Sequence, residues 1–181
     1  GGEQQTMPAY HSSLNDLSVD TVCMMSILPL KTAAKGPAPK GKESEEDIVD
    51  EAIKFFRANV LFASFEVKGG ADRVLIFLTL YISQCLKRME KAGDKASGNK
   101  ILFDLSKEKF PLPGESGWLL GGHIPAPKKR ADEDLVRNYM KQLREETGLR
   151  LLNVLYQHDE SKPDKFWMGF SKRKFMNLMV R

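Results

Sequence analysis

The sequence predicts an all-α fold: a compact single-domain helical bundle with a central, largely buried helix at about Asp72–Lys91, surrounded by other helices and by long Pro/Gly-rich loops. The first observation behind this prediction is the apolar run Val74–Ile82, which only Thr79 interrupts. The second is a pair of amphipathic segments, Asp47–Val60 and Asp132–Glu146, each with one apolar face. Two one-sided helices are the neighbours that a helix enclosed on all sides requires.

The central segment is interpreted as a helix from its length and its flanking residues, because a short apolar run alone fits a buried strand equally well. The pair Gly69-Gly70 ends the preceding segment, and Asp72 can cap the helix or lie in its first turn. Basic residues occupy the last turns and Gly93 follows as a stop signal. Apolar residues surround the first half but form a single stripe in the second, so we expect full enclosure only in the first half. The continuous stripe consists of Val74, Leu75, Leu78, Ile82, Cys85, Leu86 and Met89.

The N-terminal region precedes the first clear helix. Residues 1–6 (GGEQQT) have no pattern and are interpreted as a non-native or extension segment, which leaves residues 7–181 as a single helical domain. A short helix within VDTVCMMSI (residues 19–27) is possible. The Pro and Gly density of residues 35–42 (KGPAPKGK) predicts an extended surface segment.

The first clear helix is expected to begin at Ser44–Asp47, because Ser followed three residues later by an acid resembles a capping box. It is expected to end near residues 60–62. Its apolar face consists of Ile48, Val49, Ala52, Ile53, Phe56 and Val60, with Phe55 at the edge.

The middle of the chain is less regular. Residues 93–99 are predicted to be a polar loop, and residues 100–110 could be a short strand or a helix. The Pro/Gly-rich stretch of residues 110–127 is predicted to wrap the surface irregularly. Four of its side chains are expected to point inward: Phe110, Leu112, Trp118 and Leu119.

The C-terminal third contains the strongest helical pattern. Three acids at residues 132–134 open the helix Asp132–Glu146, and Thr147-Gly148 is expected to end or break it. Residues 149–156 are predicted to form a further short helix, followed by a turn at His158–Pro163. Residues 166–179 show features of both a strand and a helix, and a helix is favoured.

Composition places limits on the function. The chain has 181 residues and a net charge of +4, with 41% hydrophobic and 29% charged residues, which is ordinary for a globular domain. No apolar run approaches the roughly 20 residues of a membrane span, and no secretory signal is evident. The two cysteines, Cys23 and Cys85, are compatible with a reducing compartment, so we expect a cytoplasmic protein.

One segment matches a nucleotide-binding pattern but fails on chemistry. Residues Gly36–Glu43 fit G-x-x-x-x-G-K, yet Glu43 stands where Ser or Thr should hold the metal. Pro37 and Pro39 also remove two of the backbone N–H groups that cradle phosphates. A Pro-rich surface arm is the better interpretation.

No other motif supports catalysis. The histidines His11, His123 and His158 lack a second ligand at metal spacing, and Cys85 lies on a buried stripe. The acids Glu45, Glu46, Asp47, Asp50 and Glu51 are interpreted as a helix start with a solvated face. The sequence therefore predicts no enzyme activity, no metal and no cofactor.

The basic charge is concentrated at the C-terminus. Residues 161–181 contain six basic residues against one acid, and the remainder of the chain is close to neutral. Within them, residues 165–176 interleave bases with aromatic rings, a composition that can bind nucleic acid. The alternative is a closing helix with a basic face toward water or an acidic protein partner.

Several collinear stretches resemble subunit 3, the 21 kDa subunit, of the actin-related protein 2/3 complex. Two departures exist: Phe166-Trp167 stands where the family usually has two tryptophans, and the loop of residues 117–130 differs. The matching stretches are PAYHSS (8–13), LPLK with KGPAP (28–31 and 35–39), DIVDEAIKFFRANV (47–60), TLYISQCLK (79–87), FPLPGESG (110–117), YMKQLREETGLRLL (139–152) and KRKFMN (172–177).

The resemblance implies a non-catalytic structural subunit that supports nucleation of branched actin filaments on the side of a mother filament. Its implied partners are the other subunits of the complex, chiefly the actin-related protein 3 subunit, and the actin filament. The implied location is the cytoplasm and its actin cytoskeleton, including cell projections and cortical actin. The alternative function is a free-standing nucleic-acid-binding helical module that uses the basic–aromatic C-terminal segment.

Candidate partner contacts follow from exposure and charge, since actin-like surfaces tend to be acidic. Trp167 is a possible anchor, although core packing explains it more simply. The candidates are Lys35, Pro37, Pro39, Trp167, Lys172, Arg173 and Lys174.

Overall fold

The computed structural model describes residues 9–181, so the expectation for residues 1–6 lies outside the described part of the chain. Five α-helices and a two-stranded sheet follow one another along these residues, with single 3-10 turns between some of them. In order, the elements are β1 (Thr21–Val22), β2 (Met25–Ser26), α1 (Ile48–Asn59), α2 (Gly70–Arg88), η1 (Met89–Lys91), α3 (Lys95–Lys107), η2 (Gly121–His123), α4 (Arg130–Leu155), α5 (Lys165–Met168) and η3 (Phe175–Asn177).

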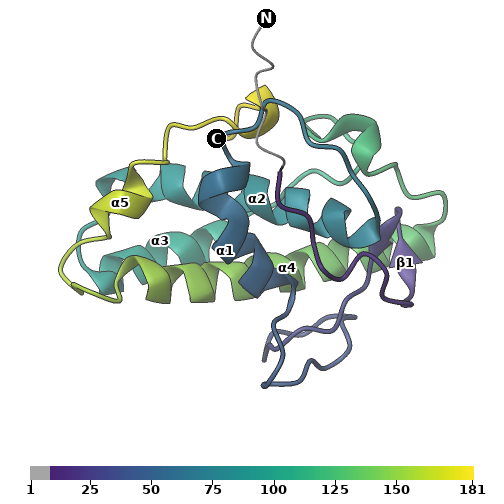
Figure 1. The fold of residues 1–181 in the computed structure, drawn as a ribbon, viewed down its shortest axis with the longest axis horizontal. Coiled ribbons are helices and arrows are strands. Elements are labelled where there is room, and N and C mark those ends of the chain that lie inside the picture. The colour runs from purple at the N-terminus through teal and green to yellow at the C-terminus, as the bar shows by residue number, and fades with distance from the viewer. Residues whose placement is uncertain (1–8) are drawn as a thin grey trace, which may run out of the picture.

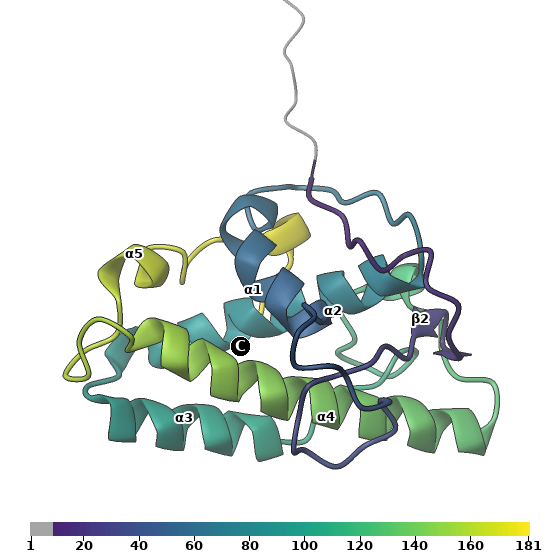
Figure 2. The same ribbon diagram turned by 60° about the horizontal axis from the view of Figure 1, so that its bottom comes forward.

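The predicted central helix is α2, which packs against α1, α3, α4 and β2 (Figures 1 and 2). Every residue from Val74 to Thr79 is buried, whereas Gln84, Lys87 and Arg88 reach the surface in the second half. The expected enclosure of the first half is therefore confirmed. The helix begins two residues earlier than expected, and its last three expected residues form η1.

The all-α prediction is wrong, because the chain also contains an antiparallel hairpin and much irregular backbone, so its class is helix-rich mixed α/β. Thr21 pairs with Ser26 and Val22 with Met25. Cys23 and Met24 make the turn with φ of 49° and 62°. Such a tight turn is normally signalled by Asn or Gly, and the absence of this signal hides the hairpin in the sequence.

Helix α4 is one continuous helix of 26 residues that runs the length of the molecule beside α3 (Figure 2). The expected break at Thr147-Gly148 is wrong. A Cβ at Gly148 would lie 3.9 Å from Cβ of Leu102 on α3, so this glycine is at a helix contact and not at a helix end. Tertiary packing overrides the low helix propensity of glycine here.

Two other boundary predictions are wrong for reasons of capping. The expected polar loop at residues 93–99 belongs largely to α3, whose N-cap Asp94 accepts a hydrogen bond from the N–H of Ser97 (3.0 Å). The first helix is capped by Asp47 instead of Ser44, with Asp50 completing the capping box. A short polar side chain starts a helix wherever its backbone geometry allows, so composition alone places the start only approximately.

The predicted helix over residues 166–179 is also wrong. Only α5 and the turn η3 are helical, and Met176 and Asn177 adopt φ of 53° and 60°, which ends any continuation. The Pro/Gly-rich stretch before α4 is irregular apart from η2, as expected. Of the four side chains expected to point inward, Leu112 is buried and Phe110 and Trp118 are half-buried, whereas Leu119 is exposed, so the expectation for Leu119 is wrong. Leu120 and Ile124 are buried in this stretch as well.

Candidate partner-binding surface

The Pro-rich arm, defined here as residues 30–41, turns back on itself at the surface. The N–H of Leu30 donates to the carbonyl of Pro39 (2.9 Å), and the N–H of Gly41 donates to the carbonyl of Leu30 (3.0 Å). Among the predicted contacts on this arm, Lys35 and Pro39 are exposed and Pro37 is half-buried. The two ends of the arm therefore fix a loop that presents these residues outward.

Gln142 of α4 holds the tip of this arm. Its Oε1 accepts a hydrogen bond from the N–H of Ala38 and its Nε2 donates to the carbonyl of Ala34, each at 3.0 Å. A side chain at Gly36 would overlap Gln142, so glycine is required for the close approach. The N–H groups of Ala38 and Gly41 are thus used inside the fold, which adds to the argument against a phosphate-binding loop.

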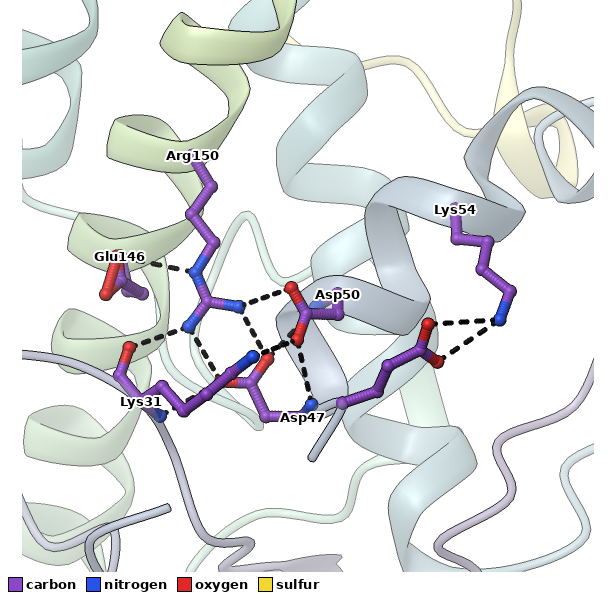
Figure 3. Close-up of polar contacts among 7 residues, drawn as sticks. Lys31, Asp47, Asp50, Lys54, Glu146 and Arg150 are labelled. Atoms are coloured by element: carbon purple, nitrogen blue, oxygen red, sulfur yellow. Dashed lines mark hydrogen bonds and ion pairs between the residues drawn. The ribbon is translucent and has the colours of Figure 1, made fainter. Parts of the chain in front are cut away.

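An ion-pair network at the base of the arm joins it to α1 and α4 (Figure 3). The guanidinium of Arg150 binds both carboxylate oxygens of Asp47, at 2.6 and 2.7 Å. It also donates to the Asp50 carboxylate (2.9 Å) and to the Lys31 carbonyl (2.7 Å). The Lys31 ammonium lies 2.7 Å from Asp50, and Glu146 lies 3.6 Å from Arg150. The network orients the arm at its first residues.

The network shifts the protonation of its members in different directions. Burial would raise the pKa of Asp47, but hydrogen bonds from Arg150 and from the backbone of Lys31 and Asp50 lower it below the usual value. Burial raises the pKa of Glu146, and nearby Arg150 offsets only part of that effect. Asp47 is therefore the stabilising acid of the network, whereas Glu146 carries an uncompensated desolvation cost when it is ionised.

We expect the free energy of unfolding of Glu146→Gln, relative to that of the wild type, to be higher at pH 7 than at pH 4. A raised pKa in the folded state means that the wild-type glutamate contributes stability below its unfolded pKa and loses that contribution as the pH rises through the folded pKa. Urea denaturation at both pH values measures the difference, with the neighbouring Glu145→Gln as control. A relative stability that does not change between the two pH values would contradict this assignment.

Two buried acids, Asp72 and Glu51, hold the segment Tyr10–Asn15. The sequence predicted Asp72 as a cap or first-turn residue of a helix and Glu51 as part of a helix start with a solvated face. Asp72 accepts hydrogen bonds from Nδ1 of His11 (2.7 Å) and from the N–H of Ser12 (2.8 Å). Glu51 accepts from the hydroxyl of Ser12 (2.6 Å). For Glu51, and equally for Asp47, the solvated-face interpretation is wrong, because both are buried and bind distant backbone. A local helical pattern cannot reveal such long-range partners.

The basic–aromatic C-terminal segment divides into a buried and an exposed part. Trp167 is 8% exposed and stacks on Phe56 with ring centroids 5.7 Å apart. Phe166 is 64% exposed, and the guanidinium of Arg57 lies over its ring at 4.7 Å. Core packing is thus the arrangement found for Trp167, and the exposed ring beside it was not among the predicted contacts.

The predicted basic cluster follows these rings. Lys172, Arg173 and Lys174 are all exposed and have no ion-pair partner within residues 9–181. The buried Phe175, whose ring meets Phe65 at 6.3 Å, anchors the segment directly behind them. The basic cluster is therefore an exposed loop whose position is fixed by the buried Phe175.

The structure does not bring the two predicted contact segments together. In Figure 1 the Pro-rich arm lies below α4, whereas the yellow C-terminal part of the chain that contains η3 lies above α2. The two segments are therefore separate surface features, and the contacts predicted for each remain predictions. In the described residues no group of three or more His, Cys, Asp or Glu side chains is placed to hold a metal, and no helix is long and apolar enough to cross a membrane.

Comparison with known proteins gives a consistent result. The family model P21-Arc, described as the ARP2/3 complex ARPC3 (21 kDa) subunit, matches residues 7–180. The chain is 50% identical over 170 residues to actin-related protein 2/3 complex subunit 3 of Dictyostelium discoideum, covering 93% of this chain and 97% of the relative. It is 47% identical to the subunit 3 of Arabidopsis thaliana (94% and 98% covered) and 39% identical to that of Saccharomyces cerevisiae (94% and 98% covered).

Proposed function

Because the chain belongs to the family of the ARP2/3 complex ARPC3 (21 kDa) subunit, we propose that it acts as a structural subunit of that complex and supports nucleation of branched actin filaments. The observation that carries this proposal is the match of residues 7–180 to the family model, together with near-complete coverage of relatives named as subunit 3. The predicted alternative, a nucleic-acid-binding module, has no support in these comparisons.

The proposal also covers the partners of the chain and its lack of enzyme activity. We take the chain to be non-catalytic and without a cofactor, and to contact other subunits of the complex, chiefly the actin-related protein 3 subunit, and the actin filament on whose side a branch forms. The place of action would be the cytoplasmic actin cytoskeleton. The exposed arm and the unpaired basic cluster support such docking, since both offer surface that the fold itself does not use.

Purification of the tagged chain from cells tests this function. Co-elution with actin-related subunits that persists after nuclease treatment is expected. Recovery of the chain alone, or with nucleic acid that high salt removes, would overturn the proposal and restore the nucleic-acid alternative.

The double variant Lys172→Glu with Lys174→Glu is expected to fold normally and to weaken assembly or branching about tenfold at low salt, with a smaller loss at high salt. Folding should be unaffected because both lysines are exposed and form no ion pair within residues 9–181. Assembly should weaken because the charge reversal repels an acidic partner surface. A reconstituted branching assay and a thermal unfolding curve measure the two effects.

The matched control is Lys128→Glu with Lys129→Glu, which makes the same charge change in another exposed loop. Equal loss for both double variants would indicate a general effect of net charge. Unchanged branching for the first would remove the basic cluster from the site.

A further inference from the structure

A groove of about 710 Å³ lies between α2, the middle of α4 at Arg144, and the loop that follows α3. Four aromatic residues contribute to its lining, and residues 179–181 close one side. The main-chain oxygens of Val180 and Arg181 accept hydrogen bonds from Lys87 (2.8 Å) and Gln84 (3.0 Å) of α2, which fixes that side. The lining includes Phe77, Tyr81, Phe110, Trp118, Leu119 and Arg144.

Arg144 is a buried cation without an acid. It is 4% exposed, its Nη2 donates to the carbonyl of Leu105 (2.7 Å), and its guanidinium lies 4.7 and 4.3 Å from the ring centroids of Tyr81 and Phe110. No carboxylate in residues 9–181 lies within 4 Å of it, and Glu108, which is near enough to interact with it electrostatically, is hydrogen-bonded to Arg88. Arg150, less than two turns further along α4, binds Asp47 and two other acids. Buried charges are normally paired, so the missing acid of Arg144 requires an explanation.

A second residue that lines the same groove also has an unsatisfied polar atom. Among the described residues, four buried side chains have a polar atom without a hydrogen-bond partner, and two of them line the groove. These two are the hydroxyl of Tyr81 and Nε of Arg144, whose side chains are in contact. Both can donate to one oxygen that enters from outside the chain.

The charge of the lining points to an anionic occupant. Four basic residues line the groove, and Glu108, their acidic neighbour there, is already bound by Arg88 through two hydrogen bonds of 2.7 and 3.0 Å. The rim also exposes apolar surface, since Leu119 is 38% and Met179 is 62% exposed. The basic residues are Lys87, Lys109, Arg144 and Arg181.

We infer that this groove is the docking site for a segment of a neighbouring subunit that presents an apolar side chain beside a carboxylate, an inference that rests on the proposed function. The carboxylate accepts hydrogen bonds from Arg144 and Tyr81 at the base of the groove. The apolar side chain packs between Phe77, Phe110 and Trp118, where aromatic rings provide a large contact area. Assembly thus supplies the acid that the isolated chain lacks.

Arg144→Met separates docking from folding. We expect the isolated variant to unfold at a temperature equal to or above that of the wild type, because an unpaired buried charge is replaced by an apolar side chain of similar length. We expect its incorporation into the complex to fall at least tenfold when tagged chains are co-expressed with the other subunits. Arg137→Met, at a half-buried position on the same helix that lies outside the groove, should incorporate normally.

The outcomes are distinguishable. Failure of the wild-type chain to incorporate would overturn the proposed function and the docking site with it. Normal incorporation of Arg144→Met, or a loss that accompanies a lower unfolding temperature, would overturn the docking site alone. Trp118→Ala, at a half-buried loop position, provides a second test and should also weaken incorporation.

A photo-crosslinker identifies the occupant directly. With p-benzoylphenylalanine placed at Leu119 in the assembled complex, we expect a cross-link to one segment of a neighbouring subunit that has Asp or Glu within a few residues, and a reduction of about tenfold in the Arg144→Met background. The same crosslinker at Phe103, an exposed α3 residue outside the groove, is the control. No cross-link at position 119, or one to a segment without an acid, would overturn the assignment.

Discussion

Replacing Arg150 with methionine is expected to lower the free energy of unfolding by about 3 kcal/mol, because it leaves the buried Asp47 carboxylate without its cation. The guanidinium makes four hydrogen bonds that connect the arm, α1 and α4 (Figure 3). The loss therefore combines an unpaired buried charge with the loss of one hydrogen bond to the arm, at the Lys31 carbonyl. Urea denaturation of the isolated chain measures it.

Arg137→Met on the same helix is the matched control. Its pairs with Glu133 and Asp134 are at the surface, so its removal should cost at most about 1 kcal/mol. Equal costs for the two variants would contradict the role assigned to the network.

The pH dependence of Arg150→Met provides a second readout. Hydrogen bonds hold the pKa of Asp47 below its usual value, so its contribution to stability is present above the unfolded pKa and is lost as the pH falls through the folded pKa. The stability difference between wild type and variant should therefore shrink as the pH falls below about 4, where the Asp47 carboxyl becomes protonated in the unfolded state. A difference that is constant with pH would indicate that packing, not charge, causes the loss.

The sequence predicted the parts of the fold that depend on local periodicity. The apolar pattern of α2 and the one-sided pattern of α1 each correspond to an observed helix. This is because a buried helix face appears in the sequence as apolar residues at helical spacing. The hairpin at Thr21–Ser26 was missed because its turn, Cys23-Met24, lacks the Asn or Gly that normally signals one. The continuity of α4 through Gly148 was missed because it depends on packing against α3, which is distant in the sequence.

The candidate site was predictable only in part, for the same reason. The exposed basic residues Lys172–Lys174 are visible as a charge cluster in the sequence. Nothing local distinguishes Arg150, which has three acids within 4 Å, from Arg144, which has none within that distance in residues 9–181. A sequence signal for the groove could have been an arginine on the apolar face of a helix, but its unpaired state appears only in three dimensions.

Phe56→Ala is expected to cost about 3–5 kcal/mol and to loosen the C-terminal segment. Phe56 is fully buried, stacks on Trp167 and meets the ring of Phe170 edge-on at 6.5 Å, so it holds α5 and the chain that leads to the basic cluster. The adjacent Phe55→Ala should cost about 1 kcal/mol, because Phe55 is half-buried and stacks on the exposed Tyr10.

Tryptophan fluorescence shows whether the loss from Phe56→Ala reaches α5. The chain has two tryptophans, so a Trp118→Phe background leaves Trp167 as the single emitter. We expect the Trp167 emission of Phe56→Ala to shift to longer wavelength at temperatures where the rest of the fold persists, because the ring loses its stacked partner and gains water. The Phe55→Ala spectrum should match the wild type. An unshifted spectrum in a variant that still loses the expected about 3–5 kcal/mol would mean that contacts other than Phe56 hold α5. The basic cluster would then keep its position independently of α1.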